Sequence, residues 1–181
     1  MYSYELRVPK DRIAVIIGSD GETKQQLQDT FKCRLDVDSS EGEVTIAGED
    51  AVMLYSAQQV IKAIARGFNP DIALNLAKQD WSLELIDLTD YSKQKNHQQR
   101  IKGRVIGSSG KARKVLENLT GCNICVYGKT VGIIAPVDTM SIAKDAVESL
   151  LSGAKHASVY KSLERKQREL KARSMIGTGN L

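Results

Sequence analysis

The chain of 181 residues is 41% hydrophobic and 27% charged, and it has no uncharged apolar run near the roughly 20 residues that span a bilayer. Its formal net charge of +4 is unevenly distributed, because residues 1–69 hold 8 Lys and Arg against 11 Asp and Glu, whereas residues 70–181 hold 18 against 11. Three cysteines, an odd number, argue against a disulfide framework, so we expect a cytoplasmic protein. The excess of positive charge in residues 70–181 suggests that this end of the chain faces a polyanion.

The sequence contains an internal repeat, which predicts two copies of one folding unit. Ile-Ile-Gly-Ser-Asp-Gly at residues 16–21 recurs as Val-Ile-Gly-Ser-Ser-Gly at residues 105–110, an offset of 89 residues that also pairs Cys33 with Cys122. The expected domains are residues 1–69 and 81–154, separated by a linker at residues 70–80 and followed by a third segment at residues 155–181.

Each copy has the same predicted order of elements. Alternating apolar residues predict a strand at residues 2–8, and a similar pattern opens the second copy at Trp81. A short helix then leads into Gly-x-x-Gly, and a second helix, two strands and an amphipathic closing helix follow. In the first copy, the second helix is expected at residues 21–31, the two strands at 33–37 and 43–47, and the closing helix at about 53–64. In the second copy, the corresponding ranges are 110–120, 122–126, 130–135 and about 142–150. The predicted fold is α+β, with the order β-α-α-β-β-α in each copy.

The third segment is predicted to be a basic helix with a frayed end. Residues 155–173 carry seven basic residues and two acids, and Val159, Leu163 and Leu170 form a narrow apolar stripe. We expect this helix to dock weakly on the second copy or on a partner, and the residues from Ser174 onward to be frayed.

The Gly-x-x-Gly loop between two helices predicts a phosphate site. Glycine lets backbone N–H groups approach an anion, and the following helix adds the positive end of its dipole. Residues 93–114, which include the second loop, hold eight basic residues and no acid. A basic run is also typical of a solvated helix face, so the charge alone leaves both interpretations open. The apolar wall for bases is expected from Ile106, Ile124 and Val126.

These features resemble the KH domain, an RNA-binding module whose Gly-x-x-Gly loop clamps about four nucleotides of single strand. The order of elements resembles the eukaryotic-style type I KH arrangement, repeated over about residues 1–153. The second copy and its tail are similar to the archaeal partner-of-Nob family, relatives of a eukaryotic pre-ribosomal KH factor also called Dim-two. The stretches that carry this similarity are residues 103–114, 117–121, 126–131 and 153–160.

The resemblance implies a protein that binds near the 3′ end of small-subunit ribosomal RNA during its maturation. It also implies contact with the Nob-family endonuclease that trims this end and with translation initiation factor two. By the same resemblance, the second loop is the backbone clamp and Lys111 supports it electrostatically. The expected RNA-binding residues are Arg100, Lys102, Arg104, Ile106, Gly107, Ser108, Ser109, Gly110, Lys111, Arg113 and Lys114.

The first loop departs from this pattern. Asp20 places an anion inside the loop, and Glu22 follows it closely, so both oppose a bound phosphate. We therefore expect weaker or vestigial RNA binding there, and a first copy that packs on the second or holds a protein partner. The weaker site comprises Gly18, Ser19, Asp20, Gly21 and Lys24.

A protein–protein adaptor remains the alternative function, with the KH folds as docking surfaces and the basic charge serving solubility. The sequence contains no catalytic constellation, so we expect no enzyme activity, cofactor or metal site. Cys122 and Cys125 have Cys-x-x-Cys spacing, but a second pair is missing, which favours core residues. His97 and His156 are the only histidines, and neither belongs to a recognisable triad.

Overall fold

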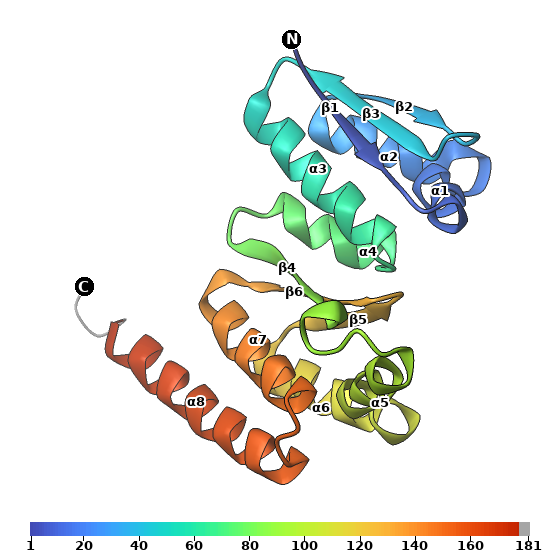
Figure 1. Ribbon diagram of the computed structural model, residues 1–181. Helices are drawn as coiled ribbons and strands as arrows, with labels where there is room; N and C mark the ends of the chain where they lie inside the picture. Colours follow the sequence, from blue (N-terminus) through green and yellow to red (C-terminus); the bar gives the residue numbers. More distant parts are fainter. Residues whose placement is uncertain (178–181) are drawn as a thin grey trace. The chain divides into compact units, whose positions relative to one another are not determined.

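The computed structural model describes residues 1–177, which form two compact units, Met1–Leu83 and the chain from Glu84 onward (Figure 1). Both units contain the order β-α-α-β-β-α, so the predicted α+β fold is confirmed. Among the helices of this described part, none is long and apolar enough to cross a membrane.

The first unit is a three-stranded sheet with helices on one face (Figure 1). The sheet order is β1-β3-β2, and β3 pairs antiparallel with both neighbours, so that Ile46 lies opposite Tyr4 on one side and Leu35 on the other. The elements are β1 (Tyr2–Arg7), α1 (Lys10–Ile17), α2 (Glu22–Phe31), β2 (Arg34–Asp38), β3 (Glu43–Gly48) and α3 (Ala51–Ala65).

The second unit repeats this arrangement and adds a long helix. Its sheet order is β4-β6-β5, the counterpart of β1-β3-β2. The elements are β4 (Trp81–Asp87), α5 (Lys95–Ile106), α6 (Lys111–Thr120), β5 (Asn123–Tyr127), β6 (Thr130–Pro136), α7 (Val137–Leu151) and α8 (His156–Gly177). In both units a single 3-10 turn, Ser19–Gly21 or Ser108–Gly110, separates the first two helices.

The closing helix of each unit packs its apolar face on the sheet. In the second unit, Val131 and Ile133 of β6 and Val147 and Leu150 of α7 are fully buried in one cluster. Full burial of such side chains stabilises a fold by about 1.5–3 kcal/mol each. The spacing of apolar residues therefore predicted this helix and the strand at residues 130–135 correctly.

The expected linker at residues 70–80 is not an extended tether. Asn69 accepts a hydrogen bond from the N–H of Asp71 (2.9 Å) and caps the short helix α4 (Pro70–Ala73), which a 3-10 turn at Leu74–Ala77 follows. Ala73 and Leu76 are buried, and both short elements contact α3. Most of this segment therefore belongs to the first unit.

The first half of α8 is part of the core of the second unit. Val159 and Leu163 are 6% and 3% exposed, and the helix contacts α6 and α7. Docking is thus firmer than the weak contact expected from the narrow stripe. The helix also continues past Ser174, whose Oγ donates to the carbonyl of Lys171 (2.8 Å), up to Gly177. The rest of the predicted frayed end, residues 178–181, lies outside the described residues.

Leu163→Ala tests this packing. Because a buried leucine is replaced and a cavity remains, we expect the free energy of unfolding of the second unit to fall by about 3 kcal/mol. The matched variant Leu170→Ala, at a half-buried site one stripe position later, should cost about 1 kcal/mol or less. Thermal and urea unfolding measure both. Equal small losses would mean that α8 is only loosely attached.

Candidate nucleic-acid interface

The two Gly-x-x-Gly loops have nearly the same backbone. Gly18 has φ 75° and ψ 176°, and Gly107 has φ 73° and ψ 175°. The third residue of each loop, Asp20 or Ser109, lies in the left-handed region with φ 51° or 53°. The two loops therefore present the same backbone shape, and they differ in the side chains that surround it.

The first glycine of each loop allows a close approach to the next helix. A Cβ atom at Gly107 would lie 2.6 Å from the backbone nitrogen of Ala112 and 2.7 Å from its Cβ. At Gly18 it would lie 2.7 Å from the backbone nitrogen of Thr23. Real Cβ atoms do not approach backbone this closely, so only glycine permits this corner.

The second loop presents donors for an anion. Gly107 donates its N–H to the carbonyl of Gly103 (2.8 Å), and Gly110 donates to that of Gly107 (3.2 Å). Within residues 1–177, the N–H groups of Ser108 and Ser109 have no hydrogen-bond partner. Two uncommitted N–H groups next to the N-terminus of a helix form a ready site for a phosphate.

Most of the predicted basic residues are available around this loop. The side chains of Arg100, Lys111 and Lys114 are exposed, and those of Lys102 and Ile106 are half-buried. Lys111 and Lys114 lie in the first turn of α6, directly after the loop. The positive charges of Lys111 and Lys114 thus follow the uncommitted N–H groups directly in the chain.

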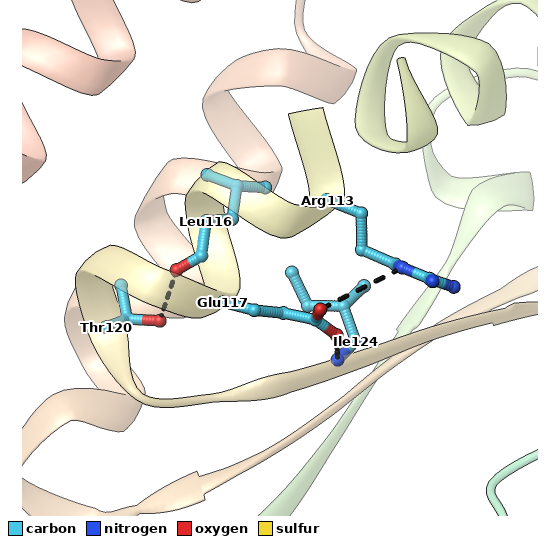
Figure 2. A network of polar contacts seen from close by, with 5 residues as sticks. All are labelled: Arg113, Leu116, Glu117, Thr120 and Ile124. Atoms are coloured by element: carbon cyan, nitrogen blue, oxygen red, sulfur yellow. Dashed lines mark hydrogen bonds and ion pairs between the residues drawn. The ribbon is translucent and has the colours of Figure 1, made fainter. Parts of the chain in front are cut away.

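Arg113 belongs to a polar network that joins α6 to β5 (Figure 2). Its Nε lies 4.0 Å from Oε2 of Glu117, and Oε1 of Glu117 accepts a hydrogen bond from the N–H of Ile124 (2.9 Å). Figure 2 shows Glu117 between the arginine and the strand. In the first unit, the amide oxygen of Gln28 accepts the equivalent bond from Leu35 (2.9 Å). Ile124 was expected in the apolar wall for bases, but it is 4% exposed and packs in the core of the second unit, so it offers no surface to a base.

Arg104 has a structural task that the sequence did not indicate. Its Nε donates to the carbonyl of Leu150 (2.8 Å), and its Nη2 donates to that of Ala154. Its side chain thus ties α5 to the C-terminal end of α7, where cations are favoured. Arg104 was expected among the RNA contacts, and these two bonds give its guanidinium a structural role as well.

The first unit makes the same tie with a different residue. Arg12 donates from Nε to the carbonyl of Ile64 (2.8 Å) and from Nη2 to that of Phe68 (2.9 Å). In the repeat alignment Arg12 matches Ile101 and not Arg104. Because the two arginines stand almost one helical turn apart in the alignment, comparison of the copies could not reveal their shared role.

Comparison with known proteins identifies the repeat. Residues 82–168 match the eukaryotic type KH-domain (KH-domain type I) family, and residues 3–63 match the KH domain family. A KH domain-containing protein of Methanocaldococcus jannaschii is 45% identical over 170 residues, covering 92% of this chain and 74% of that protein. The chain belongs to this family of tandem KH-domain proteins. The predicted pair of type I KH domains is thereby confirmed.

Two further matches, one solved structure and one eukaryotic protein, show which KH-domain proteins this chain is similar to. A crystal structure of an a/eIF2alpha–aDim2p–rRNA complex from Pyrococcus horikoshii contains a chain with a TM-score of 0.86 and 39% identity, covering 93% of this chain and 95% of that one. The pre-rRNA-processing protein pno1 of Schizosaccharomyces pombe is 30% identical over 129 residues, which are 70% of this chain and 54% of that protein. This chain thus spans about half the length of that eukaryotic relative. The predicted resemblance to the archaeal Dim-two-like family is confirmed.

KH domain 1 has a groove between the loop, the second helix and the following strand, and the residues that line it are opposite in net charge to their counterparts in KH domain 2. In KH domain 1, the ionisable residues lining the groove are Asp20, Glu22, Lys24, Asp29, Arg34 and Asp36. The matching residues of KH domain 2 are Ser109, Lys111, Arg113, Asn118, Asn123 and Cys125. Two uncharged residues of the groove, Gln25 and Gln28, are matched by the charged residues Lys114 and Glu117. The formal charge is therefore −2 in KH domain 1 and +2 in KH domain 2.

Cys122 of KH domain 2 is a buried thiol. Cys122 is buried, and this burial raises the pKa of its thiol to about 11, so it is protonated at neutral pH. In the part of the chain that the structure describes, no group of three or more His, Cys, Asp or Glu side chains could hold a metal ion. Cys122 therefore acts as a small core residue.

Proposed function

We propose that this chain is an assembly factor of the small ribosomal subunit that binds single-stranded RNA near the 3′ end of the small-subunit rRNA. KH domain 2 supplies the main clamp. The observation that carries the proposal is the pair of uncommitted N–H groups at Ser108 and Ser109, with Lys111 and Lys114 in the helical turn that follows them. Relatives whose names include pre-rRNA processing and an rRNA complex support the choice of RNA.

The clamp works by backbone donation and charge. A phosphate of the strand accepts from the Ser108 and Ser109 N–H groups, and Lys111 and Lys114 neutralise it from the first turn of α6. The half-buried residues Ile106 and Val126 then offer an apolar wall to the neighbouring bases. Phosphate contacts of this kind fix the position of the strand, whereas the wall and groove select the bases.

KH domain 1 contributes less to RNA affinity in this proposal. Its loop has the same backbone, but Asp20 stands inside it and the groove is acidic. An acidic groove suits a basic protein surface better than a phosphate chain. This observation favours a second, adaptor function for KH domain 1 within the same assembly.

We propose two protein partners. The Pyrococcus horikoshii structure combines a similar protein with a/eIF2alpha and rRNA, which supports initiation factor two as a partner. The endonuclease of the Nob family, which trims the rRNA end, is the second partner that we propose. Both contacts would take place in the cytoplasm, where the small subunit matures.

The dependence of RNA binding on salt tests the clamp against the adaptor alternative. Contact with about four phosphates of a single strand predicts a slope near −3 for log K against log salt, because each contact releases counterions. Affinity should fall roughly 50-fold between 50 and 200 mM salt. Fluorescence anisotropy with a labelled single-stranded RNA measures this slope. A slope near zero would support the adaptor function alone.

Matched loop variants test the division between the domains. The double change Ser108→Asp and Ser109→Asp gives the second loop the residues Gly-Asp-Asp-Gly, and the single change Ser19→Asp gives the first loop the same four residues. We expect the double variant to lose at least tenfold in RNA affinity, about 1.4 kcal/mol, because two anions occupy the phosphate site. The Ser19→Asp variant should lose much less.

Both loop variants should fold. Asp20 already adopts, in the first loop, the backbone conformation that an aspartate in place of Ser109 would need in the second. Exposed changes of this kind also rarely exceed about 0.5 kcal/mol in their effect on stability. Melting temperatures provide the control. An equal loss of affinity in the two variants would show that both domains clamp the RNA and would contradict the proposed division.

A further inference from the structure

A second concave site lies beside the loop of KH domain 2, away from the groove. It is a cleft of about 400 Å³ between α5, the loop, the first turn of α6 and the start of α8. The side chains used below are Arg100, Ser108, Lys111, His156 and Tyr160. None of Arg113, Glu117 and Ile124, the network of the groove side, lines this cleft. Its volume falls in the range of about 300–1,000 Å³ typical of ligand sites.

The cleft is cationic and has an aromatic wall. Arg100 and Lys111 are exposed at it, and none of the described residues that line it is acidic. His156 and Tyr160, one helical turn apart on α8, form an edge-on ring pair with centroids 6.0 Å apart and planes at 64°. Tyr160 is half-buried, and this burial raises the pKa of its hydroxyl.

The aromatic wall is held rigidly. Nε2 of His156 lies 2.8 Å from the carbonyl oxygen of Arg104. Because a carbonyl only accepts, Nε2 must carry the hydrogen, which fixes the ring orientation. Arg104 is itself bound to Leu150 and Ala154, so α5, α7 and α8 are joined at this point. A wall that is ordered in advance loses little entropy when a ligand binds.

The KH fold alone does not produce this cationic cleft, because KH domain 1 has the same fold and lacks the residues that form it. In KH domain 1 the residues that match Arg100 and Lys111 are Asp11 and Glu22, both of opposite charge. In the first unit, all of which the structure describes, α3 is followed by the four-residue helix α4, and no ring pair equivalent to His156 and Tyr160 is formed there. The cleft therefore depends on residues specific to KH domain 2 and on α8.

We propose that this cleft holds a further nucleotide of the RNA strand, outside the stretch that the KH clamp covers. Its phosphate lies between Arg100 and Lys111, and its base or ribose lies against the ring of Tyr160 beside His156. Ser108 and Lys111 belong both to the clamp and to the cleft, so a strand held at the loop reaches the cleft without leaving the protein surface. This inference rests on the proposed RNA-binding function.

The test measures RNA affinity against RNA length. Single-stranded RNAs copied from the 3′ end of small-subunit rRNA, four to ten nucleotides long, are titrated with the full chain and its variants. Arg100→Gln and Tyr160→Leu should each weaken the longer RNAs about tenfold, because a phosphate contact or a stacking partner is lost. Tyr160→Leu, whose residue lies outside the clamp, should leave a four-nucleotide RNA, which the clamp alone fills, within about twofold.

Two matched controls isolate the cleft. Lys95→Gln removes a positive charge from the same helix, outside the cleft, and should change affinity less than twofold. Tyr160→Phe keeps the ring and the packing and should bind like the original chain. The salt slope should become shallower by about 0.7 in Arg100→Gln, the value for one phosphate contact on a single strand, and stay unchanged in Tyr160→Leu. Melting temperatures confirm folding.

The outcomes separate the two proposals. If no RNA of any length binds the original chain, the proposed function itself fails. If RNA binds and the cleft variants match the original chain at every length, the cleft inference is overturned while the function stands. An equal loss of Tyr160→Leu on the four-nucleotide RNA, or a loss in Lys95→Gln as large as that in Arg100→Gln, would also overturn it, because the effect would then belong to the clamp or to general charge. A loss confined to the longer RNAs supports it.

Discussion

The close contact between the first glycine of each loop and the first turn of the next helix sets the geometry of both domains. The sharp turn between α5 and α6 brings Gly107 so close to Ala112 that no Cβ atom would fit at this position. This turn leaves the N–H groups of Ser108 and Ser109 outside the helical hydrogen-bond pattern. The same corner at Gly18 gives KH domain 1 the same backbone. The anion site is thus a product of packing, and the surrounding side chains decide how well it is used.

The side chains of the two domains have diverged around that shared backbone. The residues that line the groove of KH domain 1 have a formal charge of −2, whereas their counterparts in KH domain 2 have a formal charge of +2. Coulomb interactions with a phosphate chain change sign accordingly, while the hydrogen bond between the second helix and the following strand is kept by Gln28 in one domain and by Glu117 in the other. The positions that hold the fold can therefore stay similar while the ligand preference changes.

Much of this was predictable from sequence, because apolar spacing and paired glycines report directly on packing. The repeat located both sheets, the closing helices and the two loops, and Asp20 indicated the asymmetry between them. Other features depend on contacts between distant residues. The role of Arg104 could not be predicted, because its partners Leu150 and Ala154 are about 50 residues away and offer only backbone carbonyls. The stripe at Val159 and Leu163 indicated a helix, but its burial depends on the surface that α6 and α7 form together.

The central claim is that the RNA phosphate meets the backbone of the second loop and much less that of the first. Backbone amide chemical shifts, recorded by NMR while a single-stranded RNA is titrated into the full chain, report on each loop separately. We expect large shift changes at the amides of Ser108 and Ser109, and small ones at those of Ser19 and Asp20. Comparable changes at both loops, or unchanged amides at Ser108 and Ser109 in the RNA complex, would contradict it.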